Sequence, residues 1–193
     1  MQFFRLIAAV TLLAVLAACA QKPSKFRTYH GPEVTQVIVY KASRRMELWH
    51  HDQMLRAFNV DLGDPIGHKQ REGDRRTPEG EYIIDRRNPN SRFHLSLGID
   101  YPNEDDKEFA KENGWKPGGD IFIHGRGPRF QNAVGDWTDG CIAVSDREME
   151  DIYAMVRDGT PISIRPGYAP DDIAPPRKPS RGLGGFWSRL RLR

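Results

Sequence analysis

Residues 120–144 read DIFIHGRGPRFQNAVGDWTDGCIAV, and this stretch decides how the chain is interpreted. The apolar run 121–123 predicts a short strand that ends at His124 and Gly125. Residues 141–144 predict a second short strand that starts at Cys141. The stretch therefore predicts a histidine and a cysteine at strand ends, where side chains remain accessible for chemistry.

A thiol beside an imidazole is a common arrangement for acyl transfer. The thiolate is the reactive form of cysteine, and a histidine from a neighbouring strand is a common base that generates it. The glycine before the cysteine lets a substrate approach the backbone closely. It also leaves the amides of Gly140 and Cys141 free to stabilise an oxyanion. These residues predict a nucleophile, Cys141, with a base, His124.

Two other interpretations fit the same pair of residues. Free cysteine is among the most buried residue types, and a histidine is often a hydrogen-bonded core residue, so Cys141 and His124 can both be structural. A zinc site formed by Cys141, His124 and His94 is a further alternative, although structural zinc usually recruits more cysteines.

Strand-type runs outnumber helical ones in the rest of the chain. Runs 34–40, 46–49 and 54–60, with short turns between them, predict an antiparallel meander, and runs 82–84, 93–99 and 161–164 predict further strands. Ser145 and Glu148 form a capping-box pattern ahead of a helix over 146–156. Residues 103–113 predict a short exposed helix or an ordered loop. The sequence thus favours a mainly β domain.

The composition limits the number of domains and the class of partner. A chain of 193 residues with 38% hydrophobic and 28% charged residues fits one globular domain once an apolar leader is set aside. The formal net charge is +3, and no Lys/Arg cluster interleaved with aromatic residues occurs in the central region. The electrostatic pattern of a nucleic-acid binder is missing, so we expect no nucleic-acid partner.

The first twenty residues predict export. Arg5 is followed by an apolar run over 6–16 and then by small residues, which is the layout of a secretory signal, and the run is too short for a typical membrane span. The ending Leu16-Ala17-Ala18-Cys19 resembles a lipobox, in which the cysteine is diacylated and becomes the new N-terminus. Ordinary cleavage after Ala20 is the alternative. We expect a protein held on the periplasmic side of the cell envelope through lipidated Cys19.

The expected boundaries follow from these signals. Residues 1–18 form a signal peptide, 19–32 a linker, 33–166 the catalytic domain and 167–193 a flexible tail rich in proline, glycine and arginine. The tail carries six basic residues against two aspartates, with aromatic residues among the last arginines. Such a tail suits an anionic membrane or an acidic cell-wall polymer, or it is a solvated extension.

At this point the sequence resembles a known family, the YkuD-type L,D-transpeptidases. Their signature is a His-Gly followed, after a loop, by Ser/Thr-x-Gly-Cys and an apolar residue. Here these positions are His124-Gly125 and Thr138-Asp139-Gly140-Cys141-Ile142. The turn GDRRTPEG at 73–80 is similar to the family's TP-x-G turn, and the stretch RFHLSLGIDYPN at 92–103 looks closer to its YafK-like branch. The resemblance spans residues 34–164.

The resemblance implies a fold and a set of roles. The fold is a mainly β, sandwich-like domain with one or two short helices. His124 is the base, Gly125 orients the imidazole through its backbone carbonyl, and Thr138 and Gly140 shape the site around Cys141. The sequence departs from the common pattern where Asp139 replaces a histidine and Ala143 replaces a polar residue.

Several further residues are candidates for binding the substrate. Arginine presents a planar fork that suits carboxylates, although a solvated surface position is the alternative for each arginine. His94 either lines the pocket or makes a structural hydrogen bond, and Trp137 either stacks on substrate or covers the core. A carboxylate near the thiol would raise the pKa of that thiol. Asp139 is therefore expected to tune the thiol or to select the substrate, and not to catalyse. The candidates are Arg92, Arg126, Arg129, Asp139, Trp137 and His94.

The implied reaction is an acyl transfer on peptidoglycan stem peptides. Cys141 attacks the carbonyl that joins diaminopimelate to D-alanine, and an amine acceptor then resolves the thioester to a cross-link or to an attached protein. No metal or organic cofactor is implied. One alternative is a hydrolase of the same fold that cleaves L,D bonds or releases a peptidoglycan-linked lipoprotein. A non-catalytic peptidoglycan-binding lipoprotein is the other.

Overall fold

The computed structural model describes residues 24–172. The predicted signal peptide, the predicted lipidation site Cys19 and residues 173–193 of the predicted tail lie outside the described residues. Within the described part, no helix is both long enough and apolar enough to cross a membrane.

Eight strands form one sheet with the order β3-β2-β1-β8-β4-β5-β6-β7. Neighbouring strands are antiparallel except for the pairs β1–β8 and β6–β7, which are parallel. The strands are β1 (Gln36–Tyr40), β2 (Arg45–His50), β3 (Gln53–Asn59), β4 (Gly80–Asn88), β5 (Ser96–Ile99), β6 (Phe122–His124), β7 (Ile142–Ala143) and β8 (Pro161–Arg165). The antiparallel meander predicted for the first three strands is confirmed.

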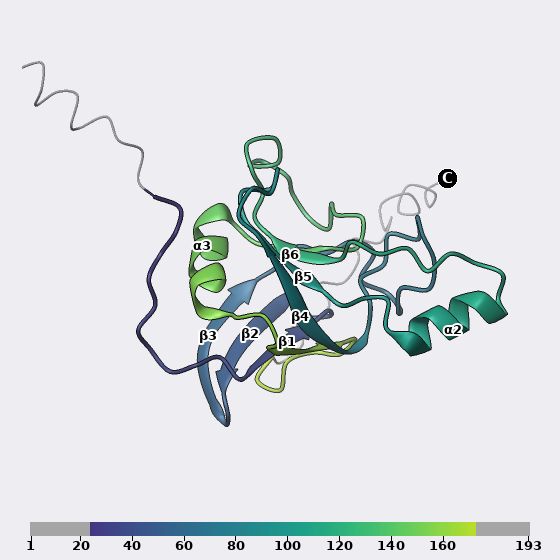
Figure 1. The fold of residues 1–193 in the computed structure, drawn as a ribbon, viewed down its shortest axis with the longest axis horizontal. Coiled ribbons are helices and arrows are strands. Elements are labelled where there is room, and N and C mark those ends of the chain that lie inside the picture. The colour runs from purple at the N-terminus through teal and green to yellow at the C-terminus, as the bar shows by residue number, and fades with distance from the viewer. Residues whose placement is uncertain (1–23, 173–193) are drawn as a thin grey trace, which may run out of the picture.

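The sheet folds over so that its two halves enclose one core (Figure 1). Strands β1 and β2 contribute Val37, Val39 and Leu48 to the main cluster of buried residues, and the half with β4, β5 and β6 contributes side chains such as Leu97 and Ile123. Strand β1 is apolar on both faces because both of its faces are covered, as its run QVIVY shows, whereas β4 begins with alternating buried and exposed residues. This arrangement confirms the predicted mainly β, sandwich-like fold.

Two helices complete the described domain, and each starts with a capping box. The predicted helix is α3 (Asp146–Met155), in which the Ser145 side chain accepts from the Glu148 amide, as expected from the sequence. Residues 103–113, for which the sequence predicted either a helix or a loop, contain helix α2 (Glu104–Glu112), capped by Asn103. Helix α3 packs against β5 and β6, whereas α2 lies at the opposite end of the domain (Figure 1).

The structure corrects the predicted strand over 93–99. Strand β5 begins only at Ser96, because residues 91–94 form a turn. The His94 amide donates to the Ser91 carbonyl, the Phe93 amide donates to the Ser91 hydroxyl, and His94 has a φ of 78°. A positive φ is incompatible with a strand, so the alternating pattern ends early. The turn presents its side chains at one end of β6.

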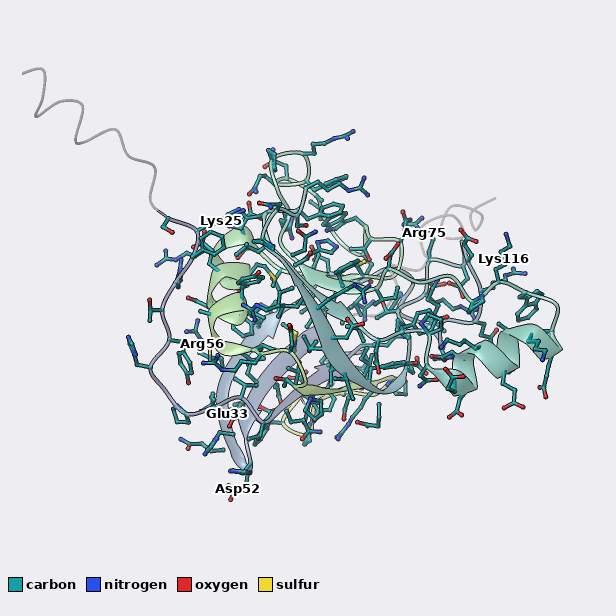
Figure 2. All side chains as sticks on the ribbon, viewed as in Figure 1. Lys25, Glu33, Asp52, Arg56, Arg75 and Lys116 are labelled. Carbon is teal, nitrogen blue, oxygen red and sulfur yellow. The ribbon has the colours of Figure 1, made fainter. Side chains whose placement is uncertain are left out.

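The segment before β1 contacts the domain. The Lys25 Nζ atom donates to the carbonyls of Pro89 and His94, at 2.6 and 3.1 Å. Lys25 lies near one end of α3 (Figure 2). Arg27 pairs with Glu150 and Asp151 of that helix. The described part of the predicted linker therefore fastens onto α3 and onto the 89–94 turn.

Candidate active site

His124 lies at the end of β6 and is buried. Its Nδ1 atom is 2.5 Å from the Gly125 carbonyl oxygen. A carbonyl oxygen can only accept, so Nδ1 carries the proton and Nε2 is left as an acceptor. Burial lowers the pKa of His124, and the positive charge of Arg92 lowers it further. The imidazole is thus held neutral, with the tautomer that a general base requires.

Cys141 directly precedes β7, next to β6. In this parallel pair, Ile123 is opposite Ile142 and His124 is opposite Ala143, so the register places Cys141 opposite Phe122. Alternate residues of a strand share a face, and so do opposite residues of neighbouring strands. Cys141 and His124 therefore lie on the same face of the sheet.

The thiol of Cys141 is held in its protonated form. Its Sγ atom lies 3.4 Å from the Asp120 carbonyl oxygen. Burial, with smaller contributions from the carboxylates of Asp120 and Asp139, raises the pKa of the Cys141 thiol from its ordinary value of 9.0 to about 11. In the unliganded site, both the thiol and the imidazole are therefore neutral.

Both residues line one cavity of about 750 Å³. This volume is within the range of small-molecule sites. The walls come from the 88–96 segment, from β6 with the residues before it, and from the loop between β6 and β7. The lining residues are Asn88, Ser91, Arg92, Phe93, Ser96, Gly119, Asp120, Ile121, Phe122, His124, Phe130, Trp137, Thr138, Asp139 and Cys141.

Three aromatic rings pack beside the imidazole, and two of them contact it. Phe93 stacks on His124 with ring centroids 4.4 Å apart, and Trp137 meets His124 edge to face at 5.8 Å. Phe130 stacks on Trp137 at 4.7 Å. The indole Nε1 of Trp137 donates to Asp61 at 2.9 Å, which fixes the ring in the cavity wall. These rings exclude water from one side of His124 and so contribute to its burial.

Thr138 and Gly140 shape the loop before Cys141. The Thr138 hydroxyl donates to the Cys141 carbonyl at 2.7 Å and accepts from the Gly140 amide at 3.2 Å. The second contact corrects the expectation that both loop amides are free, because the Gly140 amide is already satisfied. The Cys141 amide has no acceptor within residues 24–172 and is the remaining candidate for an oxyanion donor.

Gly140 cannot be replaced without strain. Its φ is 120°, and a Cβ atom there would lie 2.6 Å from the Arg76 carbonyl oxygen. Arg76 belongs to the 73–80 turn, so this turn packs directly under the loop of Cys141. Lys41 is fully buried and holds the turn by donating to the carbonyls of Gly67 and Thr77 and to Glu79, at 2.7, 2.8 and 2.7 Å.

The backbone after His124 is held by a carboxylate that the sequence did not single out. One oxygen of Asp146, at the start of α3, accepts from the amides of Arg126 and Gly127 at 2.7 and 2.9 Å. Gly125 fits closely here, since a Cβ atom would lie 2.6 Å from the same carboxylate. Asp146 directly follows the predicted N-cap residue, Ser145. The capping pattern marks the start of the helix but does not predict that Asp146 binds the amides of Arg126 and Gly127.

Two of the predicted substrate-binding residues have protein partners instead. The Arg126 guanidinium is 2.5 Å from Asp61 and also donates to the Ala133 carbonyl. His94 lies 3.0 Å from Glu150 of α3, outside the cavity lining, in the structural role that was its alternative. Asp61, which binds both Arg126 and Trp137, was missed because its partners lie far away in sequence.

The remaining three candidates are all exposed, and two of them, Arg92 and Asp139, line the cavity. Asp139 lines the cavity with an exposed side chain, 3.4 Å from Arg75. Arg92 lines the cavity with its guanidinium carbon 4.8 Å from the Phe93 ring centroid. Arg129 is exposed and does not line the cavity. Within residues 24–172, no three His, Cys, Asp or Glu side chains converge as metal ligands.

The fold and this site define a class of protein, and comparison with known families shows which class it is. The YkuD family, described as the L,D-transpeptidase catalytic domain, matches residues 35–164. The chain belongs to this family. The matched region includes His124, Cys141 and every cavity-lining residue.

Individual proteins are similar to this chain in sequence or in fold. The chain is 26% identical to YafK of Escherichia coli strain K12 over 167 residues, which is 79% of this chain and 62% of YafK. It therefore spans less than two thirds of the length of that relative. A variant crystal structure of the helical cell shape determining protein Pgp2 from Campylobacter jejuni superposes with a TM-score of 0.56 at 25% identity, covering 73% of this chain and 50% of Pgp2. Bd1075 of Bdellovibrio bacteriovorus gives a TM-score of 0.53 at 24% identity, covering 70% of this chain and 49% of Bd1075.

Proposed function

We propose that this protein is a peptidoglycan L,D-transpeptidase with Cys141 as nucleophile and His124 as general base. The observation that carries the proposal is the placement of both residues on one face of the β6–β7 pair, in one cavity, with the Nδ1 proton of His124 fixed by the Gly125 carbonyl. An imidazole oriented in this way has its Nε2 lone pair available for the thiol proton.

The proposed first half-reaction forms an acyl-enzyme. Because the thiol and imidazole are both neutral at rest, Nε2 of His124 takes the Cys141 proton as sulfur attacks the diaminopimelate carbonyl. A sulfur–carbon bond forms, and the carbonyl oxygen becomes an oxyanion facing the Cys141 amide. Collapse breaks the carbon–nitrogen bond, and the imidazolium returns its proton to the leaving nitrogen of D-alanine. A thioester remains on Cys141.

The second half-reaction transfers the acyl group to an amine. His124 removes a proton from the attacking amine, the nitrogen–carbon bond forms, and the sulfur–carbon bond breaks to restore the thiol. An amine of another stem gives a cross-link, and a protein lysine gives an attached protein. If water attacks instead, the thioester is hydrolysed to a shortened stem with a free carboxylate. When the leaving amine of the first half-reaction is a lysine of an attached lipoprotein, the net reaction releases that lipoprotein.

The location and role in the cell are part of the proposal. The predicted lipobox at Cys19 supports anchoring on the periplasmic side of the envelope, where peptidoglycan stems are accessible. A contribution to cell shape is proposed by analogy with Pgp2, whose name states that role for that protein.

Mass spectrometry of purified protein with disaccharide tetrapeptide tests this function. We expect release of D-alanine, a thioester adduct on Cys141, and a cross-linked or shortened product that identifies the acceptor. Cys141→Ala should abolish the adduct and the release while leaving the fold intact, because the role of this side chain is chemical. Release of D-alanine by Cys141→Ala at the wild-type rate would refute the mechanism.

A further inference from the structure

The cavity that holds Cys141 and His124 has one permanently cationic side chain among its described lining residues, Arg92. Three other arginines near the cavity pair with carboxylates of the protein: Arg126 with Asp61, Arg86 with Asp85 and Asp120, and Arg75 with Asp139. Within residues 24–172, Arg92 makes no side-chain hydrogen bond or ion pair, and its guanidinium lies over the Phe93 ring. An arginine whose donors are all unused is suited to bind an external anion.

The turn that carries Arg92 is held in place. Lys25 binds the carbonyls of Pro89 and His94 on either side of it, and Ser91 closes the turn with its hydroxyl and carbonyl. Figure 2 places Lys25, which binds this turn, and Arg75, which pairs with Asp139, on opposite sides of the β5–β6 region. The position of the Arg92 backbone is therefore fixed before any ligand binds, which reduces the entropy cost of binding.

Arg92 lies at the His124 end of the cavity. Phe93 contacts both residues, since its ring centroid is 4.4 Å from that of His124 and 4.8 Å from the guanidinium carbon of Arg92. Asp139 lines the cavity two residues before Cys141, and the Asp120 carbonyl oxygen lies 3.4 Å from the Cys141 Sγ atom, so both aspartates lie on the Cys141 side. Arg92 is thus the cationic lining residue on the His124 side, whereas the two lining aspartates on the Cys141 side are each paired with an arginine.

The direction of the substrate follows from the role of His124. The base must return its proton to the leaving nitrogen, so the leaving residue has to lie on the His124 side of Cys141. In an α-amino acid, the carboxylate is attached to the same carbon as the nitrogen. A leaving D-alanine with its nitrogen at His124 therefore presents its carboxylate toward Arg92.

We infer that Arg92 binds the terminal carboxylate of the leaving D-amino acid and restricts donors to stems that end in a free carboxylate. This inference rests on the proposed function and adds to it a residue that determines which bond is cut. A stem whose terminal carboxyl is amidated, or whose leaving amine is a lysine side chain, lacks this carboxylate at Arg92. Such donors lose the contact, whichever acceptor follows.

Binding to an inactive chain tests the inference separately from catalysis. In the full chain carrying Cys141→Ala, the dissociation constants of a tetrapeptide stem ending in D-alanine and of the same stem ending in D-alaninamide are measured by calorimetry. Arg92→Gln is added to this background to remove the charge. Arg129→Gln is the matched control, because Arg129 is an exposed arginine outside the cavity.

We expect the acid stem to bind about tenfold more tightly than the amide, as for one charge-assisted contact open to solvent. Arg92→Gln should remove this preference, and Arg129→Gln should keep it. The inference is overturned if the acid and amide bind equally to the Cys141→Ala chain, or if the preference survives Arg92→Gln. A misfolded variant would lose affinity for both stems, whereas the acid-to-amide ratio reports on the carboxylate alone.

The outcome is distinguishable from that of the proposed function. If the acid preference depends on Arg92 but the chain with Cys141 releases no D-alanine, the binding assignment stands and the proposed reaction fails. If the acid stem releases D-alanine and the amide stem releases D-alaninamide at equal rates, the reaction stands and the assignment to Arg92 fails.

Discussion

Replacing Thr138 by valine removes one hydroxyl from the loop that positions Cys141. The side chain is 4% exposed, and its hydroxyl both donates to the Cys141 carbonyl at 2.7 Å and accepts from the Gly140 amide at 3.2 Å. Valine has nearly the same shape but can make neither hydrogen bond. The substitution therefore isolates the hydrogen bonds from the packing.

The expected loss of stability follows from the two backbone groups that are left without a partner. A buried polar group that loses its hydrogen bond costs about 1 to 3 kcal/mol, so Thr138→Val should lower the free energy of unfolding by about 3 kcal/mol. Urea denaturation followed by circular dichroism measures this change as a lower midpoint. We expect D-alanine release to fall as well, because the Cys141 backbone loses one of its contacts.

The matched control is Thr138→Ser, which keeps the hydroxyl and loses only a methyl group. It should retain most of the stability and activity that valine loses. The reasoning fails if Thr138→Val unfolds within about 0.5 kcal/mol of the wild type, since that is the size of an ordinary surface change. It also fails if serine is as damaging as valine, which would assign the effect to packing.

Three further predictions follow from the structure. Gly140→Ala should lower both turnover and thermal stability, because the new methyl group would meet the Arg76 carbonyl at 2.6 Å; unchanged turnover would contradict the close packing of the turn. Lys41→Met should lower the free energy of unfolding by about 3 kcal/mol in urea denaturation, since it leaves Glu79 and two carbonyls without their donor. An unchanged free energy of unfolding would mean that water replaces the ammonium group. Burial raises the pKa of Cys141 to about 11, so iodoacetamide should alkylate the unliganded thiol about a hundredfold more slowly at pH 7 than a free cysteine, with a rate that rises beyond pH 9. Because the fold favours the neutral thiol, this group also makes the protein less stable as the pH rises above 9. An alkylation midpoint below pH 8 would refute the raised pKa of Cys141.

Local sequence patterns were sufficient to predict most of the elements. The β-rich runs predicted the meander, and the Ser145–Glu148 capping box predicted the start of α3, because such signals depend on residues only a few positions apart. The strand ends at His124 and Cys141 were predicted in the same way. The contact between the His124 ring and the Gly125 carbonyl, expected from the family resemblance, joins neighbouring residues and is present.

Only the tertiary structure decided which charged side chains are available to a ligand. Arg92 and Arg126 look alike in sequence, yet Arg126 is bound by Asp61, 65 positions away, while Arg92 lines the cavity over Phe93. Lys41 likewise holds a turn that follows it by some 30 residues. Such pairs form because the sheet folds over and brings distant strands and loops together. A hydrogen bond depends on distance and direction in space, and neither quantity is encoded in the spacing of residues along the chain.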